Sequence, residues 1–462
     1  MSKVAWWKCV SVIIVVWAMT GIAAPAQVFN TLYEFDGANG EGNPVVSLVQ
    51  GRDGNFYGTT SASTGPGAVF RINPAGELTT LYSFCSQPNC ADGESPYGGL
   101  LLATDGNFYG TTYEGGSNPS CGTIFRITPQ GMLTTLHNFT GLDGSNPIEP
   151  LIQGSDGDFY GTTPIGGSNA GVLFKITSTG EFTLLYDFGN GDNGAFPHGT
   201  LIQARDGNFY GTTYEGTVFR YRLDGTLTTL YHLSYLKAGL LEASDGNFYG
   251  TTYQGGFGCN GYGCGTVFKI TPGGRLSTVH FFQGTDGAES QAPLIQATDG
   301  NLYGMTASGG ANNVGTIYRI MPGGRLTTLY SFCSQPKCSD GEAPFGGPLQ
   351  ATTGMFYGTT AVGGKGQCSG SGCGTVFSLD MGLGPFVSFV RRYGRVGQSG
   401  GILGQGFIGT VGVSFNGTPA SFTVVSDTFI RATVPVGATT GYVTVATPTG
   451  TLTSNVPFRV IK

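Results

Sequence analysis

Eight cysteines give this 462-residue chain its most regular chemical pattern, because they fall into pairs with one shared Cys-x4-Cys spacing. In an exported protein that spacing predicts local disulfides, each closing a loop. Zinc binding is the alternative, but the spacing is not that of a standard zinc finger and the chain has only four histidines. The predicted pairs are Cys85–Cys90, Cys259–Cys264, Cys333–Cys338 and Cys368–Cys373. Cys121 lacks a partner at this spacing, and its pairing across loops with Cys85 or Cys90 stays open.

Histidines and carboxylates, which could transfer protons or bind metal, form no recognisable catalytic constellation. The four histidines share no common position, and neither a Gly-x-Ser-x-Gly elbow nor a His-Glu-x-x-His motif occurs. Acidic pairs such as Asp92 with Glu94 and Asp340 with Glu342 could hold structural calcium, which prefers about six to eight oxygens. No Asp-x-Asp-x-Asp-Gly loop accompanies them, so turn chemistry is the favoured interpretation. We expect no catalysis and no cofactor.

A repeated stretch must position these residues. Asp53-Gly-Asn-Phe-Tyr-Gly-Thr-Thr60 returns along the chain with small changes, at intervals of 39 to 54 residues. Recurrence at such intervals is typical of a repeat architecture. The tyrosines of the motif are Tyr57, Tyr109, Tyr160, Tyr210, Tyr249, Tyr303 and Tyr357.

Each repeat predicts four short antiparallel strands, as the third repeat illustrates. Its strands are expected near 151–153, 159–163, 171–177 and 182–188, with Asp-Gly supplying the positive φ of a tight hairpin turn. Four such strands in about 50 residues correspond to one propeller blade. The sequence therefore predicts an all-β fold with a seven-bladed β-propeller over residues 27–383. Thr31-Leu-Tyr-Glu-Phe35 resembles a fourth strand and is expected to complete the seventh blade, closing the ring.

The two ends of the chain differ from the repeats. Residues 1–26 combine Lys3 and Lys8 with an apolar run and Ala24-Pro25-Ala26, a pattern typical of a cleaved signal peptide, with a retained anchor as the alternative. No later segment predicts a transmembrane helix. Residues 384–462 predict an immunoglobulin-like β-sandwich. Without residues 1–26 the charge is 20 − 28 = −8, which argues against nucleic acid as a partner. We expect a secreted or cell-surface monomer.

Loop lengths suggest where a ligand could bind. The fourth repeat has the shortest loop after its motif, and the next connection is also short. We predict a groove at Tyr214, Glu215, His232 and Tyr235, with a tolerated deletion in a variable surface loop as the alternative. A second pattern lies in the first strands, which carry Gln50, Leu102, Gln153, Gln203, Glu242, Gln296 and Gln350 at one shared position. These side chains could line the channel at the other face or bond the backbone of neighbouring blades.

The repeat unit also resembles a known family. Leu-Thr-Thr-Leu-Tyr-Ser-Phe, Asp-Gly-Asn-Phe-Tyr-Gly-Thr-Thr and Gly-Thr-Val-Phe-Lys-Ile-Thr are similar to the GloVer tandem repeat of choice-of-anchor proteins, across residues 30–379. Ile402-Leu-Gly-Gln-Gly-Phe407 and Phe415-Asn-Gly-Thr-Pro419 resemble an IPT/TIG domain. The resemblance implies export or surface attachment and implies no activity. Together these patterns predict a non-catalytic binding module that recognises a glycan or a protein. The alternative is a propeller lyase or hydrolase with a divalent metal in its central mouth.

Overall fold

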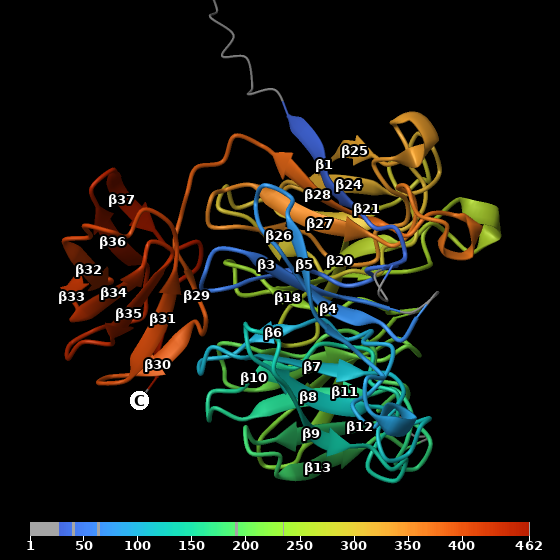
Figure 1. The fold of residues 1–462 in the computed structure, drawn as a ribbon, viewed down its shortest axis with the longest axis horizontal. Helices are drawn as coiled ribbons and strands as arrows, with labels where there is room; N and C mark the ends of the chain where they lie inside the picture. The colour runs from blue at the N-terminus through green and yellow to red at the C-terminus, as the bar shows by residue number, and fades with distance from the viewer. Residues whose placement is uncertain (1–26, 39–41, 62–64, 190–192, 234, 462) are drawn as a thin grey trace, which may run out of the picture.

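The computed structural model describes residues 27–38, 42–61, 65–189, 193–233 and 235–461 (Figure 1). The predicted signal peptide lies outside these described residues. The fold is all-β, and the repeats form separate four-stranded antiparallel sheets, none of which closes on itself. Among the described residues, no helix combines the length and hydrophobicity needed to cross a membrane.

The third repeat shows how the sequence makes one sheet. Its strands β10 (Ile152–Gln153), β11 (Phe159–Thr163), β12 (Val172–Ile176) and β13 (Phe182–Asp187) pair antiparallel in chain order. Gly157 turns the chain between β10 and β11 with a φ of 99°, a conformation that glycine adopts without strain. A Cβ on Gly161 would lie 2.6 Å from Cζ of Phe174, so the motif glycine makes room for the aromatic ring of the next strand.

The other repeats follow the same strand order. The first and second sheets are β2 (Val49–Gln50), β3 (Phe56–Thr60), β4 (Ala68–Ile72) and β5 (Leu78–Ser83), then β6 (Leu101–Leu102), β7 (Phe108–Thr112), β8 (Thr123–Ile127) and β9 (Leu133–Asn138). The fourth and fifth are β14 (Ile202–Gln203), β15 (Phe209–Thr212), β16 (Thr217–Tyr221) and β17 (Leu227–His232), then β18 (Leu241–Glu242), β19 (Phe248–Thr252), β20 (Thr266–Ile270) and β21 (Leu276–Phe281). The sixth is β22 (Ile295–Gln296), β23 (Leu302–Thr306), β24 (Thr316–Ile320) and β25 (Leu326–Ser331).

The seventh sheet joins the two ends of the repeat region. It contains β26 (Leu349–Gln350), β27 (Phe356–Thr360) and β28 (Thr375–Asp380), and its fourth strand is the N-terminal β1 (Val28–Glu34). Strand β1 pairs antiparallel with β28, so that Asn30 lies opposite Ser378. The predicted pairing of the N-terminal strand with the seventh repeat is therefore present.

The Phe-Tyr pair of the repeated motif packs one sheet on the next. In six of the seven repeats, the tyrosine ring lies 3.9 to 4.5 Å, centroid to centroid, from the motif phenylalanine of the following sheet. The pairs are Tyr57–Phe108, Tyr109–Phe159, Tyr160–Phe209, Tyr210–Phe248, Tyr303–Phe356 and Tyr357–Phe56. These rings are almost fully buried, so the motif forms the hydrophobic core between sheets.

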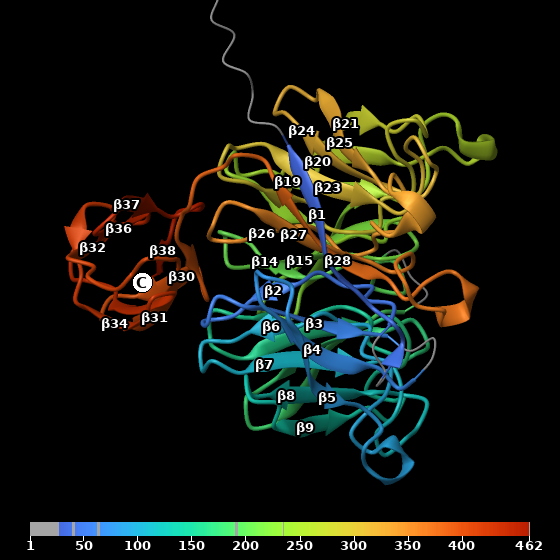
Figure 2. The same ribbon diagram turned by 45° about the horizontal axis from the view of Figure 1, so that its top comes forward.

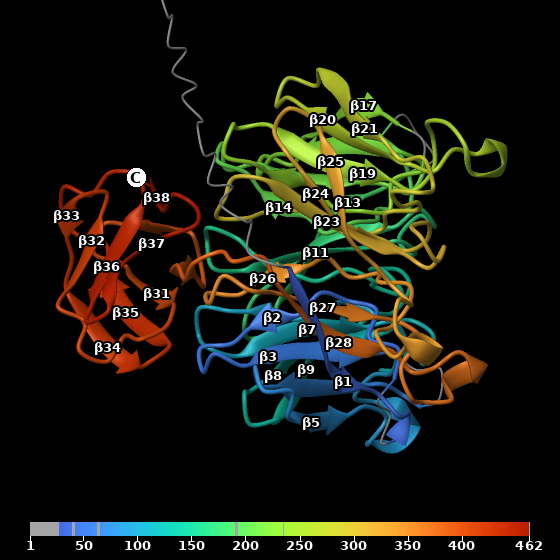
Figure 3. The same cartoon turned by 90° about the horizontal axis from the view of Figure 1, so that it is seen from above.

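The C-terminal part has its own core and lies beside the ends of the repeat sheets (Figures 2 and 3). One sheet is β29 (Ser388–Phe389), β31 (Ser399–Leu403), β35 (Phe429–Thr433) and β34 (Phe422–Ser426), and the other is β33 (Thr418–Pro419), β32 (Gly412–Phe415), β36 (Val443–Thr447) and β37 (Gly450–Thr453). Strands β30 (Tyr393–Arg395) and β38 (Arg459–Ile461) pair in parallel. Ile402, Phe415 and Val445, from these two sheets, meet in one buried cluster.

Four short 3₁₀ turns lie in the cysteine-containing loops, away from the C-terminal sheets (Figure 1). They are η2 (Pro88–Cys90), η3 (Cys259–Gly261), η4 (Pro336–Cys338) and η5 (Cys368–Gly370). Disulfides join Cys85–Cys90, Cys259–Cys264, Cys333–Cys338 and Cys368–Cys373. Among the described residues, Cys121 is the free cysteine, and it is buried.

Candidate functional site

Seven connections between the sheets each contribute one residue to the lining of the same cavity. Each of these residues stands at one position, four residues before the first strand of its sheet. The cavity has a volume of about 490 Å³ and is called the mouth below. Its seven equivalent lining residues are Val45, Tyr97, Ile148, His198, Lys237, Gln291 and Phe345. No two of them are the same residue type, although the strands on either side are nearly identical from repeat to repeat.

The backbone that leads into the mouth is held in an unusual conformation. Two positions before each lining residue, a residue other than glycine has a φ between 50° and 59°. Such left-handed residues are uncommon and persist only where the surrounding structure fixes them. They are Asn43, Ser95, Asn146, Phe196, Tyr235, Glu289 and Ala343. The repeat thus holds the same turn seven times and varies only the side chain that the turn presents.

One wall of the mouth carries a hydrogen-bonded polar cluster. Glu149 accepts a hydrogen bond from Oγ1 of Thr200 at 3.0 Å, and its other oxygen lies 3.4 Å from Nδ1 of His198. The same Nδ1 lies 3.0 Å from the carbonyl oxygen of Lys237. Since both neighbours of Nδ1 are acceptors, we assign the proton of the neutral ring to Nδ1. Nε2 of His198 is then the atom that can accept a proton or a hydrogen bond.

Lys237 places a cation beside aromatic rings at this wall. Its Nζ lies 4.0 Å from the ring centroid of Tyr253 and 6.0 Å from that of Tyr214, both within cation–π range. Burial lowers the pKa of Lys237, and the negative charge of Glu289 opposes that effect. Burial and the same Glu289 raise the pKa of Tyr253. Lys237 therefore carries a partly desolvated positive charge, which an anionic ligand group would stabilise.

The structure brings together two of the four residues of the predicted groove. The rings of Tyr214 and Tyr235 lie 6.3 Å apart, and Tyr214 is also 6.2 Å from the ring of His198. His232 instead lies at the end of β17, where its Nδ1 is 3.4 Å from Oγ1 of Thr217. Glu215 is exposed. The tyrosines thus adjoin the mouth, whereas no described contact links His232 or Glu215 to them.

The sequence prediction missed Glu149, His198 and Lys237. Lys237 follows Leu236, so no proline marks it; for His198 the signal is the position after a recurrent proline, where an otherwise constant repeat changes residue type. Glu149 stands one residue further along, so only the folded chain shows that it meets His198.

The shared glutamine position lies at the other end of the sheets, and its side chains bond neighbouring sheets. Each side-chain oxygen accepts a hydrogen bond, at 2.8 to 3.2 Å, from a backbone N–H of the sheet before it. The acceptor–donor pairs are Gln153–Thr104, Gln203–Ser155, Glu242–Arg205, Gln296–Ser244, Gln350–Thr298 and Gln50–Thr352. The structural interpretation of this pattern is therefore confirmed at six positions.

The acids between the sheets are used by their own turns. Asp92 accepts hydrogen bonds from Tyr82 and from the backbone of Ser86 and Gln87, and Asp340 repeats this arrangement. Glu94 and Glu342 each lie near a cysteine pair, but the sulfurs of both pairs are already in disulfides. The chemistry of these groups fits turn formation better than cation binding.

Residues 19–217 and 214–423 each match the Gloeobacter/Verrucomicrobia repeat. The chain belongs to this repeat family. None of the curated proteins matches it.

Solved structures similar to this member of the Gloeobacter/Verrucomicrobia repeat family have propeller-like folds. The extracellular domain of a putative hybrid two-component system from B. thetaiotaomicron aligns with a TM-score of 0.53 and 12% identity, covering 92% of this chain and 46% of that one. The chain thus spans about half the length of that domain. The WD40 β-propeller domain of Doa1 aligns with a TM-score of 0.50 and 11% identity, covering 76% of this chain and 97% of that one. At such identities the likeness shows the fold alone.

Proposed function

We propose that this protein is a secreted or cell-surface binding module whose mouth binds an acidic saccharide without catalysing a reaction. The observation that carries this proposal is the set of seven different side chains presented into one cavity by seven equivalent turns. A repeat that keeps its scaffold and varies one inward-facing position provides a specific ligand surface. A cavity of about 490 Å³ is of the size that small ligands occupy.

The chemistry of the mouth favours a sugar that carries a carboxylate. Tyr97 and Phe345 offer aromatic faces for the apolar side of a sugar ring. Thr200, Glu149 and His198 can exchange hydrogen bonds with hydroxyl groups. Lys237 supplies the positive charge that pairs with a carboxylate. The extracellular domain similar in fold supports a location outside the cell.

We also infer that the seven repeat sheets form a closed seven-bladed propeller over residues 27–383. Two contacts between the first and seventh sheets support closure, namely the Phe56–Tyr357 ring contact and the Gln50–Thr352 hydrogen bond, and the β1–β28 pairing within the seventh sheet adds to them. We also propose that residues 384–462 are an IPT/TIG-like domain and that residues 1–26 are a signal peptide. We propose that the exported protein is a monomer.

A matched pair of lysine variants tests the ligand. Lys237→Gln removes the charge at the mouth, whereas Lys337→Gln removes the same charge from exposed η4. A glycan array on the mature chain identifies the saccharide, and calorimetry then compares the variants. We expect Lys237→Gln to weaken binding about tenfold or more, since charge-assisted hydrogen bonds contribute about 1.5–3 kcal/mol. Lys337→Gln should bind as the wild type does. The proposal is contradicted if the protein binds no acidic saccharide on the array, or if both variants lose the same affinity.

One observation favours the enzyme alternative, because His198 and Glu149 are paired within the mouth. Catalytic zinc sites use about three protein ligands, and these two side chains make an incomplete set. Metal analysis of the purified protein separates the two functions. The protein would be a lyase or hydrolase if it contained stoichiometric divalent metal and if a catalytic activity disappeared when the metal was removed and returned when the metal was added back.

A further inference from the structure

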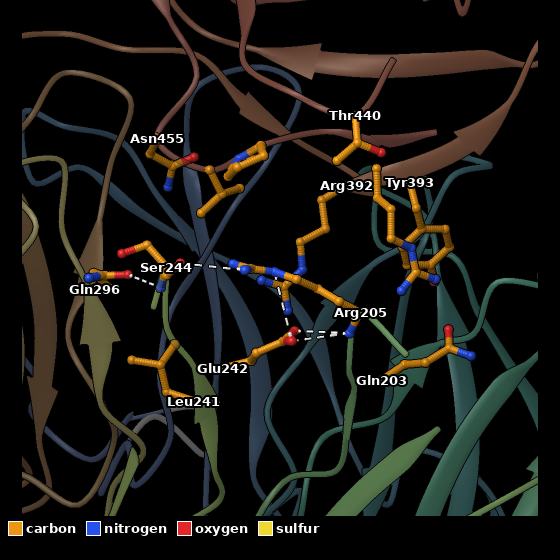
Figure 4. Close-up of a pocket in the computed structure, with 13 residues that line it drawn as sticks. Gln203, Arg205, Leu241, Glu242, Ser244, Gln296, Arg392, Tyr393, Thr440 and Asn455 are labelled. Atoms are coloured by element: carbon orange, nitrogen blue, oxygen red, sulfur yellow. Dashed lines mark hydrogen bonds and ion pairs between the residues drawn. The ribbon is translucent and has the colours of Figure 1, made fainter. Parts of the chain in front are cut away.

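A second cavity lies at the opposite end of the repeat sheets, where the C-terminal domain covers them. Its volume is about 270 Å³, and it is called the chamber below. The repeat sheets contribute Gln203, Arg205 and Glu242 to its wall, and the C-terminal domain contributes Arg392, Tyr393 and Arg459. Figure 4 shows Arg205 and Glu242 of the repeat sheets and Arg392 of the C-terminal part converging on one space.

Positive charge dominates the wall of the chamber. Three arginines face it, and among the described lining residues Glu242 is the acidic one. Glu242 is already engaged, because both of its oxygens accept hydrogen bonds from the backbone N–H of Arg205, at 3.1 and 3.2 Å. Nε of the Arg205 side chain lies 3.8 Å from the same carboxylate. One carboxylate thus faces three guanidinium groups within a chain whose overall charge is −6.

Two of the arginines retain unused donors. Arg459 donates from Nη1 to the carbonyl oxygen of Ala204 at 2.8 Å, but its buried Nε has no hydrogen-bond partner. The Arg392 guanidinium makes no hydrogen bond among the described residues and points toward Glu242 inside the chamber (Figure 4). Arg392 is exposed to solvent, whereas Nε of Arg459 is buried. An unpartnered buried donor is costly, and an anion that accepts its hydrogen bond offsets that cost.

The chamber also continues toward another arginine. An adjoining cavity of about 360 Å³ shares Gln203, Arg392 and Tyr393 with it and adds Arg391. A planar guanidinium group can donate two parallel hydrogen bonds to two oxygens of a carboxylate or phosphate. Several guanidinium groups together can therefore bind one ligand that carries several such groups.

We propose that the chamber is an anion site, which binds a small molecule with two or more carboxylate or phosphate groups between the repeat sheets and the C-terminal domain. Arg392 and Arg459 contact the anion from one side, and Arg205 contacts it from the other. The bound anion therefore also strengthens the contact between the two parts of the protein. This site is separate from the mouth and does not depend on the ligand proposed there.

Calorimetric titration of the full mature chain with citrate and with inorganic phosphate tests this site, at constant ionic strength because salt screens charge. The variant Arg392→Gln removes the central guanidinium, and Arg395→Gln removes an exposed one from the neighbouring strand. We expect at least one of the two anions to bind the wild type. Arg392→Gln should weaken that binding tenfold or more, whereas Arg395→Gln should change it less than twofold. Binding of citrate alone identifies a carboxylate ligand, and binding of phosphate alone identifies a phosphate ligand.

Two results would overturn the proposal: neither anion binds the wild type, or both variants lose the same affinity. Arg392→Lys is a control for misfolding, because lysine keeps the positive charge but cannot donate a pair of hydrogen bonds from a planar group. It should bind with an affinity between those of the wild type and Arg392→Gln. Lys337→Gln, which removes a charge from exposed η4, should bind the anion as the wild type does, and an equal loss there would also contradict a site in the chamber.

Discussion

At the scale of single residues, the aspartate of each repeated turn links the turn to the core. In six repeats this carboxylate accepts a hydrogen bond from the hydroxyl of the motif tyrosine at 2.7 to 3.0 Å. Burial and the neighbouring Asp206 raise the pKa of Tyr210 to about 12. In the seventh repeat Thr353 replaces the aspartate, and the hydroxyl of Tyr357 faces the sulfur of Met355 instead. The motif is therefore a structural unit of turn, strand and core.

Asp245 should make the free energy of unfolding depend on pH. Burial opposes its ionisation, but hydrogen bonds from Lys269, Asn247 and Tyr249 lower its pKa to about 2. A carboxylate with a depressed folded-state pKa stabilises the protein above its unfolded-state pKa of about 4 and loses that effect as the pH falls toward 2. Because Asp245 is partly exposed, we expect on the order of 1 kcal/mol.

Urea unfolding of Asp245→Asn between pH 2 and pH 6 measures this contribution. The variant should be less stable than the wild type at pH 6, and the difference should shrink toward pH 2. Glu215→Gln, at an exposed side chain, is the matched control. A difference that stays constant across this pH range would contradict the assigned role of the carboxylate.

At the scale of elements, hydrogen bonds from the first strands tie each sheet to its neighbour. The side-chain oxygen of Gln350 accepts a hydrogen bond from the backbone N–H of Thr298 at 3.0 Å. Its Nε2 donates hydrogen bonds to Oγ1 of Thr298, at 3.0 Å, and to the carbonyl oxygen of Gly354. Leu102 occupies the same position in the second repeat and cannot make these bonds. There the side chain of Arg52 donates to the carbonyl oxygens of Ala103 and Thr104 instead.

Replacing Gln350 by leucine should therefore destabilise the protein through the contact between the sixth and seventh sheets. We expect a loss of about 1–3 kcal/mol, because an N–H and a carbonyl lose their partners. Gln130→Leu, at an exposed turn, should change the free energy of unfolding by less than about 0.5 kcal/mol. Chemical unfolding followed by circular dichroism compares them, and equal stability of the two variants would contradict this role.

The elements were more predictable from the sequence than the site was. Strands such as β11 and β12 come from local patterns, namely an Asp-Gly turn followed by short runs of buried residues, and the structure confirms the four-stranded sheets. The mouth depends on side chains that are far apart in the chain: Glu149 and His198 are joined only because consecutive sheets bring their connections together. His232 lies at the end of β17, whereas Tyr235 lies beyond the strand end and packs against Tyr214, so closeness in the sequence did not bring the two residues together.

At the scale of the whole molecule, the mouth and the chamber lie at opposite ends of the repeat sheets. The arrangement of the C-terminal domain is set by contacts that no repeat pattern records. Oγ1 of Thr428 donates to the carbonyl oxygen of Arg52 at 2.7 Å, and the Arg52 guanidinium lies 4.7 Å from the ring centroid of Phe429. Such contacts depend on single surface residues, so no pattern in the sequence predicts how the C-terminal part meets the repeat sheets.

Phe35 offers a test of whether the ring of sheets is closed. Its side chain is fully buried next to Phe70 of the first sheet, with ring centroids 5.4 Å apart, and it packs in one cluster with Val376 of the seventh sheet. Phe35→Ala should cost about 3–5 kcal/mol, as expected for a large buried aromatic side chain. In a closed ring, hydrogen exchange should accelerate in β3 and β4 of the first sheet together with β27 and β28 of the seventh. Phe281→Ala, on the exposed face of β21, should leave both regions protected. If exchange instead accelerated in only one of the two sheets, the ends would be independent and the seven sheets would form an open array.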